Sequence, residues 1–284
     1  MAYEFTKPCK IDLPANVEFQ EETWMTYIGD ENIRFRAVYL NRLLAAGLET
    51  EILFGQNLVS LRKPQLNIRL GETDEVMDVA YPFTAEQDQI VNVLTLTQSA
   101  LIKIDNALSA GGDLVQKRGD TAIYSVVLEL SPGATAPRSR LAYLAVNGRS
   151  LVYVEGGAFA LGTLTRTLDM HENRDGLLFD SPRIREAYHL ATKDLPQPIA
   201  VLGFSELENQ AKVTYSLKAL GDQSGKLRVT KVLSFASPDD MTTNLDSARE
   251  LFLDSKDSTC QAQSHLVASS VRPLNELRVQ LQSL

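Results

Sequence analysis

The chain has 284 residues, 44% of them hydrophobic, and a formal charge of −8 from 36 acidic and 28 basic side chains. This composition is typical of a globular protein with a substantial core. The negative balance excludes a broad electropositive surface for nucleic acid or anionic membranes. The longest apolar windows, such as 199–204, have the length of strands, so no membrane span is expected.

The N-terminus lacks the basic and then apolar pattern of a cleaved signal peptide. We therefore expect a cytoplasmic or other intracellular protein. Cys9 and Cys260 are the only cysteines, and they lie near opposite ends of the chain. This spacing matches neither a disulfide framework nor a metal site, so we predict two incidental thiols, no metal and no cofactor.

The first third of the chain predicts strands and one short helix. Alternating residues at 34–38 favour a strand, and 39–46 favours a helix that ends at Gly47. From 48 to 83, short period-2 segments separated by glycine and proline predict an antiparallel meander. The lead-in before residue 33, which includes Trp24, reads as extended.

A long amphipathic helix is predicted after the meander. Thr84 offers an N-cap with Gln87 three residues later. The following positions recur at spacings of three and four and define one helical face: Ile90, Leu94, Thr97, Leu101, Ile104 and Leu108. The helix is expected to end at Gly111-Gly112.

The same order of strands followed by a helix is predicted twice more. Strands at 121–130 and 140–155, the second bent at the hairpin turn Asn147-Gly148, precede a helix at 158–168. Strands at 199–204, 212–220 and 226–235 precede a capping box at 237–240. The helix that follows carries Met241, Leu245, Ala248 and Phe252 on one face.

These elements predict an α+β fold with a predominantly antiparallel sheet, amphipathic helices and a divergent internal repetition of sheet-plus-helix units. The polar stretch 169–193 contains a short helix capped near Ser181 and suggests a boundary. We expect an N-terminal α+β region at 1–170, a connecting region at 171–198 and a C-terminal α+β region at 199–284. A single compact domain is the alternative.

The C-terminus predicts an amphipathic docking helix that begins near Pro273. Leu274, Leu277 and Leu281 share one helical face. An isolated helix of this length is marginal in water, so the stripe should be ordered only against a partner surface. That surface belongs either to the same chain or to a second subunit, and the leucines are our candidates for a contact with a protein partner or for self-association.

Two loops carry weak chemical signals. The segment 156–163 (Gly-Gly-Ala-Phe-Ala-Leu-Gly-Thr) opens a predicted helix, but it lacks the lysine of a phosphate-binding loop. The segment 169–175 and Asp180 gather carboxylates and His171, without a ligand spacing typical of metal sites. We interpret the first as a tight turn and the second as a solvated linker.

The remaining nucleophile and base candidates form no constellation in the sequence. Ser205 lacks the second glycine of a nucleophile elbow. Ser60 and Lys63 have a Ser-x-x-Lys spacing, but a strand would direct them to opposite faces. The three histidines, at 171, 189 and 265, are isolated, so we assign no catalytic, cofactor-binding or metal-binding residue.

Three functions remain open. The first is a non-enzymatic interaction, structural or assembly protein that acts through its surface. The alternative is an enzyme or small-molecule-binding protein whose pocket is built from sequence-distant residues. The third, an acidic ring around nucleic acid, is disfavoured because the helix predicted at 84–108 has Lys103 as its only base.

Overall fold

The computed structural model describes residues 8, 34–48, 57–82, 88–129, 138–157, 159–176, 178–195, 197–204, 212–252 and 258–282. Trp24, Thr84 and Ser205 lie outside this part of the chain. Two compact units are present. Unit 1 consists of residues 1–36 and 176–284, and unit 2 consists of residues 37–175.

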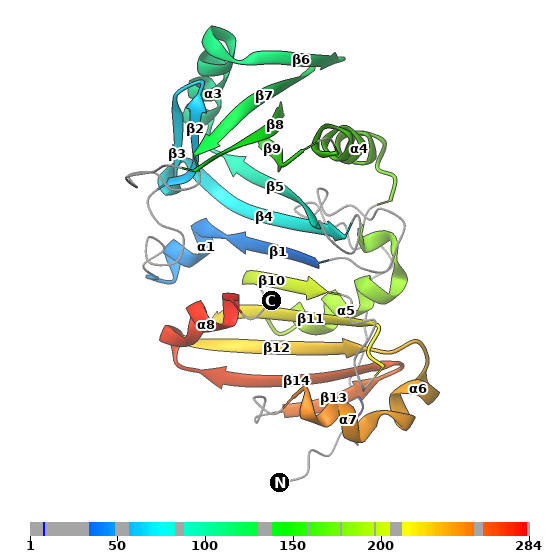
Figure 1. Cartoon of the computed structure of the whole chain (residues 1–284). Helices are drawn as coiled ribbons and strands as arrows, with labels where there is room; N and C mark the ends of the chain where they lie inside the picture. The colour runs from blue at the N-terminus through cyan, green and yellow to red at the C-terminus, as the bar shows by residue number, and fades with distance from the viewer. Residues whose placement is uncertain are drawn as a thin grey trace. The chain divides into compact units, whose positions relative to one another are not determined.

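Unit 2 is built on an antiparallel sheet of the order β4-β5-β9-β8-β7-β2-β3, with β6 paired to β7 (Figure 1). Its strands are β2 (Asn57–Lys63), β3 (Leu66–Arg69), β4 (Thr73–Pro82), β5 (Asp88–Leu96), β6 (Asp113–Arg118), β7 (Thr121–Glu129), β8 (Ser139–Asn147) and β9 (Ser150–Glu155). Gly148, with φ +57°, forms the predicted β8–β9 turn. Strands occupy most of the described part of 48–83, as predicted.

The long helix predicted from Thr84 is wrong in its first half. Residues 88–96 form β5, which pairs with β4 on one side and β9 on the other. Helix α3 (Gln98–Gly111) starts only after Thr97, whose hydroxyl accepts a hydrogen bond from the Ala100 N–H. The spacing of Ile90 and Leu94 does not distinguish a helix from a strand, because residues four apart also share one face of a strand.

Two further helices of unit 2 agree with the sequence. Helix α1 (Leu40–Ala45) follows β1 (Arg34–Tyr39) and ends before Gly47, which has φ +73°. Helix α4 (Ala160–Asn173) contacts β5, β8 and β9. Its buried face consists of Ala160, Thr163, Leu164, Thr167 and Leu168.

Unit 1 is built on antiparallel strands in the order β13-β14-β12-β11-β10. Its strands are β10 (Pro198–Phe204), β11 (Tyr215–Gln223), β12 (Lys226–Ser234), β13 (Ser258–Ala262) and β14 (His265–Arg272). Gly203 on β10 leaves room for two aromatic residues, because a Cβ there would overlap the Phe35 ring and the Tyr215 hydroxyl.

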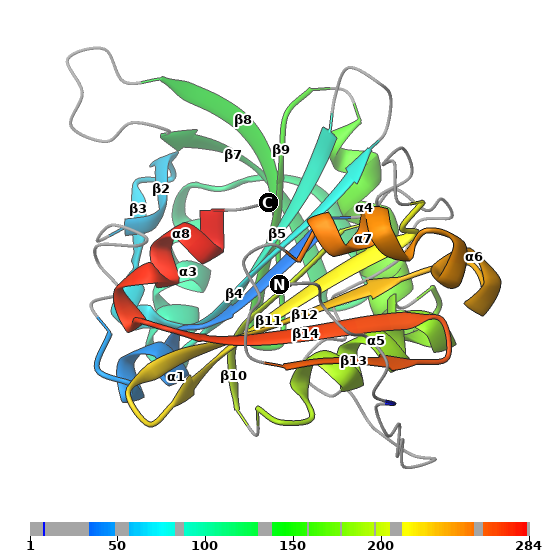
Figure 2. The same cartoon turned by 90° about the horizontal axis from the view of Figure 1, so that it is seen from below.

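Helices lie on both faces of the unit 1 sheet (Figure 2). Helix α5 (Pro182–Thr192) contacts β11, β12 and β14. Helices α6 (Pro238–Thr243), α7 (Leu245–Glu250) and α8 (Leu277–Gln282) cover the opposite face. The N-cap of the predicted capping box is present, since the Ser237 hydroxyl accepts from the Asp240 N–H at 3.1 Å and Pro238 is the first helical residue. The Asp240 carboxylate accepts from the Ser237 hydroxyl at 2.6 Å.

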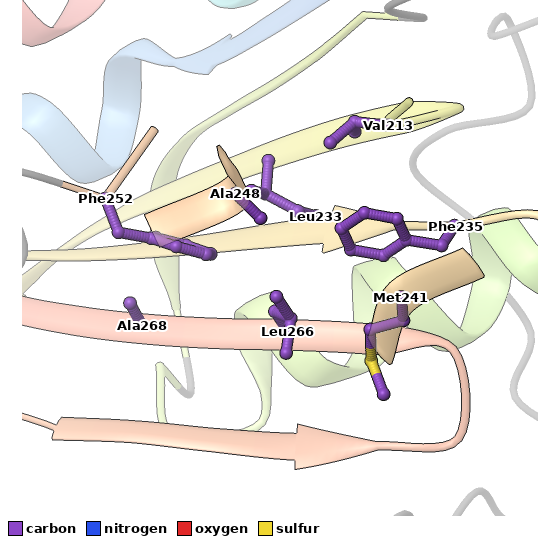
Figure 3. Packing of buried hydrophobic residues seen from close by; sticks show 8 residues of the cluster. All are labelled: Val213, Leu233, Phe235, Met241, Ala248, Phe252, Leu266 and Ala268. Carbon is purple, nitrogen blue, oxygen red and sulfur yellow. The ribbon is translucent and has the colours of Figure 1, made fainter. Parts of the chain in front are cut away.

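An apolar cluster fills the space between α6, α7 and the sheet (Figure 3). Met241, Ala248 and Phe252 come from the helical segment, as their spacing predicted, although the chain forms two short helices there. The strands and their flanks supply Val213, Leu233, Phe235, Leu266 and Ala268.

The C-terminal helix is shorter than predicted. Residues through Arg272 belong to β14, which pairs with β12 and β13, and only 277–282 form α8 after the 3-10 turn Leu274–Glu276. The β-branched residues Val267 and Val271 favour the strand. Within the described residues no helix is long and apolar enough to cross a membrane.

The molecule is therefore α+β with a predominantly antiparallel sheet. The two units share a topological step. In unit 2, β4 and β5 are followed by α3 and then by the meander β6–β9. The last strand of this meander, β9, pairs with β5. In unit 1, β10–β12 are followed by α6 and α7 and then by the hairpin β13–β14. The last strand of this hairpin, β14, pairs with β12.

Candidate functional site

A buried polar cluster joins α5 to the unit 1 sheet. Ser234 on β12 lies directly opposite His265 on β14. The Ser234 Oγ is 2.8 Å from the His265 Nδ1, and the His265 Nε2 is 3.1 Å from the Glu186 Oε2 on α5. Ser234 and His265 are completely buried, and the Glu186 side chain is partly exposed.

The environment of this cluster favours the neutral imidazole. Burial lowers the pKa of His265, and the nearby Arg183 acts in the same direction, whereas Glu186 opposes both. The net pKa lies below its ordinary value. A neutral ring satisfies both neighbours when Nε2–H donates to the Glu186 carboxylate and Nδ1 accepts from the Ser234 hydroxyl.

The cluster has the residue types of a hydrolase triad but a different geometry. In such a triad the serine hydroxyl bonds to Nε2, and the carboxylate orients the ring through Nδ1. Here the two ring nitrogens have exchanged partners, and the Ser234 hydroxyl is inaccessible to a substrate. Ser234 and His265 therefore hold α5 against the sheet and are poorly placed for nucleophilic catalysis.

A different kind of site lies at β6, on the edge of unit 2. Five of its six residues are exposed, and the sixth, Arg118, is half-buried. The side chains of Leu114 and Val115 are 58% and 43% exposed. Among the described residues, β6 pairs only with β7, so its outer backbone edge is available for another strand (Figure 1).

The other two sheet ends differ from β6. Strand β3 has only four residues, and the Lys103 ammonium donates to the Asn67 carbonyl on it at 2.6 Å. On strand β13, Gln261 forms a parallel bridge with Pro8. Proteins commonly shorten or cover strand edges in such ways to prevent unwanted pairing. Strand β6 is thus the edge that combines exposed apolar side chains with an open backbone.

The two loops singled out in the sequence belong to α4 and its flanks. Gly156, with φ +120°, permits the turn that leads from β9 into α4. The acidic segment is not a solvated linker, because Asp169–Asn173 forms the last turns of α4 and Arg174 caps it in the left-handed region. Asp169 makes an ion pair with Arg118. The described residues contain no cluster of metal-ligating side chains.

The remaining single-residue candidates are dispersed. Ser60 is buried on β2, while Lys63 makes an exposed ion pair with Asp113 at 3.1 Å. His171 lies on α4 and His189 on α5. His189 follows Glu186 by three residues on α5, whereas Ser60, Lys63 and His171 belong to unit 2. The three members of the Ser234 cluster come from separate parts of the sequence.

The C-terminal leucines are directed into their own chain. Leu277 and Leu281 are 2% and 6% exposed, and Leu274 is half-buried. The Lys218 ammonium on β11 lies 3.4 Å from the Gln280 Oε1 on α8, which places the helix over this sheet. The predicted docking surface therefore lies within the chain itself.

One expectation about the cysteines is wrong, because Cys260 is disulfide-bonded. Sequence reasoning also missed β6, whose residues Asp-Leu-Val-Gln-Lys-Arg lack an apolar period. It missed the Ser234 cluster too. A polar residue within each of the apolar strands 226–235 and 265–272 was the available signal, since buried polar groups require partners.

No family model and no curated protein matches this sequence. Solved structures do show a similar fold. Crystal form I of TP0453 has a TM-score of 0.50 at 10% sequence identity, over 95% of this chain and 99% of that one. Crystal form III of TP0453 has a TM-score of 0.49 at 11% identity, over 95% and 100% of the two chains. At this identity the first match supports a shared fold and nothing further.

Proposed function

We propose that this chain is a non-enzymatic assembly protein that self-associates by adding a strand at the outer edge of β6. The supporting observation is the exposed β6 edge with Leu114 and Val115. Strand addition supplies affinity through backbone hydrogen bonds and specificity through the side chains that alternate along the strand. The C-terminal leucines have no part in this proposal because their own chain covers them.

A second copy of the chain is the occupant that the sequence of β6 favours. In an antiparallel pairing about a two-fold axis, Asp113 of one copy lies opposite Arg118 of the other, and Leu114 lies opposite Lys117. Opposite charges in such positions stabilise a strand pair. Asp113 and Arg118 already pair with Lys63 and Asp169 in their own chain, so the new contacts would extend two existing ion pairs.

The bulge in β6 shapes this contact. Leu114 pairs with Tyr124 and Gln116 with Ile123, so Val115 is the extra residue. A bulge interrupts the regular ladder and redirects side chains. The proposed interface therefore depends on the apolar contacts of Leu114 and Val115 as well as on backbone hydrogen bonds. The bulge also makes β6 a poorer template for other strands, because it interrupts the regular hydrogen-bond ladder.

The test is the solution mass of the purified chain as its concentration is raised, measured by sedimentation equilibrium. We expect association from 31.4 kDa chains to dimers. Leu114→Lys places a lysine opposite Lys117 of the other copy at two points of each interface, and these like charges should weaken the dimer by roughly 100-fold. The exposed position of Leu114 predicts an unchanged melting temperature.

Ile102→Lys is the matched control, because Ile102 is 55% exposed on α3 in the same unit. It should leave the mass unchanged. Amide exchange should also slow at β6 when the wild-type protein is concentrated. A wild-type chain that stays monomeric up to about 100 µM, or a dimer that Leu114→Lys does not weaken, contradicts the proposal.

The internal repetition belongs to the same proposal. In each unit, the final strand pairs with the strand that precedes the helices: β9 pairs with β5, and β14 pairs with β12. This shared pairing supports a divergent duplication of one sheet-plus-helix unit. Of the two units, unit 2 has the extra strands β6 and β7, so the proposed interface lies in an elaboration of the common pattern.

A further inference from the structure

Strand β13 carries a cysteine that forms a disulfide bond. Cys260 lies on this edge strand and is disulfide-bonded. The sequence contains one other cysteine, Cys9. We infer that a Cys9–Cys260 disulfide fastens the N-terminal segment beside β13, in a protein that acquires this bond in an oxidising compartment.

The backbone supports this pairing independently of the cysteine count. Pro8 and Gln261 form a parallel bridge, and each immediately neighbours one of the two cysteines. The bridge therefore brings the residues next to the two cysteines side by side on neighbouring strands.

The residue at the bridge suits an outer position on a sheet. Proline has no backbone N–H, so Pro8 can accept a hydrogen bond but cannot donate one to a further strand. A strand edge next to proline is a poor template for continued pairing. The disulfide and Pro8 together would close the end of the unit 1 sheet that β13 would otherwise leave open.

Forming the bond requires an oxidant. The Cys9 and Cys260 thiols lose two protons and two electrons, and a disulfide-exchange partner accepts them and becomes a dithiol. Reducing compartments such as the bacterial cytoplasm keep most thiols reduced, whereas exported proteins retain disulfides. The bond therefore favours an oxidising compartment over the intracellular location that the N-terminal sequence suggested.

Peptide mapping tests the pairing directly. The full chain is oxidised with a glutathione redox buffer, its remaining thiols are alkylated, and it is digested with trypsin without reduction. We expect residues 1–10 and 257–278 to appear as one linked species that reduction separates. Alkylation of both cysteines in the folded, oxidised protein, or a link between two chains, would overturn the inference.

Matched variants test the structural role of the bond. Cys9→Ser and Cys260→Ser should each lower the melting temperature by roughly 10 °C, because either loss frees a very long loop in the unfolded chain. The double variant should be no less stable than the single variants, and a reductant should lower the melting temperature of the wild type alone. If the losses in melting temperature were additive, the serines would act through local packing, and the proposed Cys9–Cys260 disulfide would be refuted.

The compartment is tested in cells that naturally produce the chain. Rapid acid quenching followed by alkylation traps thiols in their cellular state. The expected result is a chain that resists alkylation until it is reduced. A fully alkylated chain in these cells would refute the oxidising compartment, even if the purified protein forms the bond.

Discussion

The two units place their polar interactions differently. Unit 1 buries the Ser234–His265–Glu186 cluster and a second hydrogen bond, between the Thr230 and Ser269 hydroxyls at 3.0 Å. Unit 2 keeps its ion pairs nearer the surface. Buried polar groups are costly to leave without partners, whereas exposed ion pairs contribute little. Substitutions of polar residues should therefore destabilise unit 1 more than unit 2.

The apolar side chains that cover the unit 1 sheet should show the largest effect. We predict that Leu277→Asp lowers the free energy of unfolding by about 4 kcal/mol, because it removes a buried leucine and places a carboxylate in apolar surroundings. Thermal and urea unfolding measure the loss. Solution mass should not change, because the contact lies within the chain.

Val279→Asp is the control on the same helix, since Val279 is 64% exposed. It should change the stability by less than about 0.5 kcal/mol. Equal losses in the two variants would mean that the charge disturbs α8 as a helix and that the burial of Leu277 is unimportant.

Sequence reasoning succeeded where one local pattern dominates and failed where pairing decides the structure. The Asn147-Gly148 turn and the Ser237 cap are local signals, and both are present. The segment 88–96 carries an apolar spacing compatible with a helix, yet neighbouring strands on both sides make it a strand. Tertiary pairing overrides a short periodicity.

The candidate sites were less predictable than the fold. Glu186, Ser234 and His265 meet through sheet register and helix docking, neither of which is visible in the sequence. In the sequence, strand β6 resembles a polar loop because five of its six residues are exposed. Its role as an edge depends on β7, which pairs with it on one side only.

After Leu277→Asp, the substitution of His265 should have the next largest effect on the free energy of unfolding. His265→Leu leaves the Ser234 hydroxyl and the Glu186 carboxylate without their imidazole partner, and we expect a loss of about 2–3 kcal/mol. Ser234→Ala combined with His265→Leu should cost less than the sum of the two single changes, because the residues share one network. Strict additivity would contradict the network.

The same residue gives a pH dependence with a definite sign. Burial, with Arg183 nearby, lowers the pKa of folded His265 below its ordinary value of 6.5. As the pH falls below 6.5, the unfolded chain binds a proton that the folded chain does not, so stability decreases until the folded pKa is reached. Above pH 6.5, the contribution of neutral His265 to the free energy of unfolding is fully present. His265→Leu should lose this part of the pH dependence, which urea unfolding between pH 5 and pH 7 measures.

The smallest effect is expected at the ion pair of unit 2. Lys103 lies 2.9 Å from Glu72 and also binds the Asn67 carbonyl, but its side chain is 40% exposed. Burial tends to raise the pKa of Glu72, and the Arg69 N–H and the Lys103 ammonium outweigh this, so the pKa lies below 4.5. The stability that ionised Glu72 contributes is therefore present above pH 4.5 and is lost as the pH falls through the lowered pKa.

Lys103→Met should lower the free energy of unfolding by about 1 kcal/mol or less and raise the pKa of Glu72, which NMR titration follows. Lys117→Met, on exposed β6, is the control that should leave this pKa unchanged. A loss in Lys103→Met as large as that in His265→Leu would remove the proposed difference between the two units.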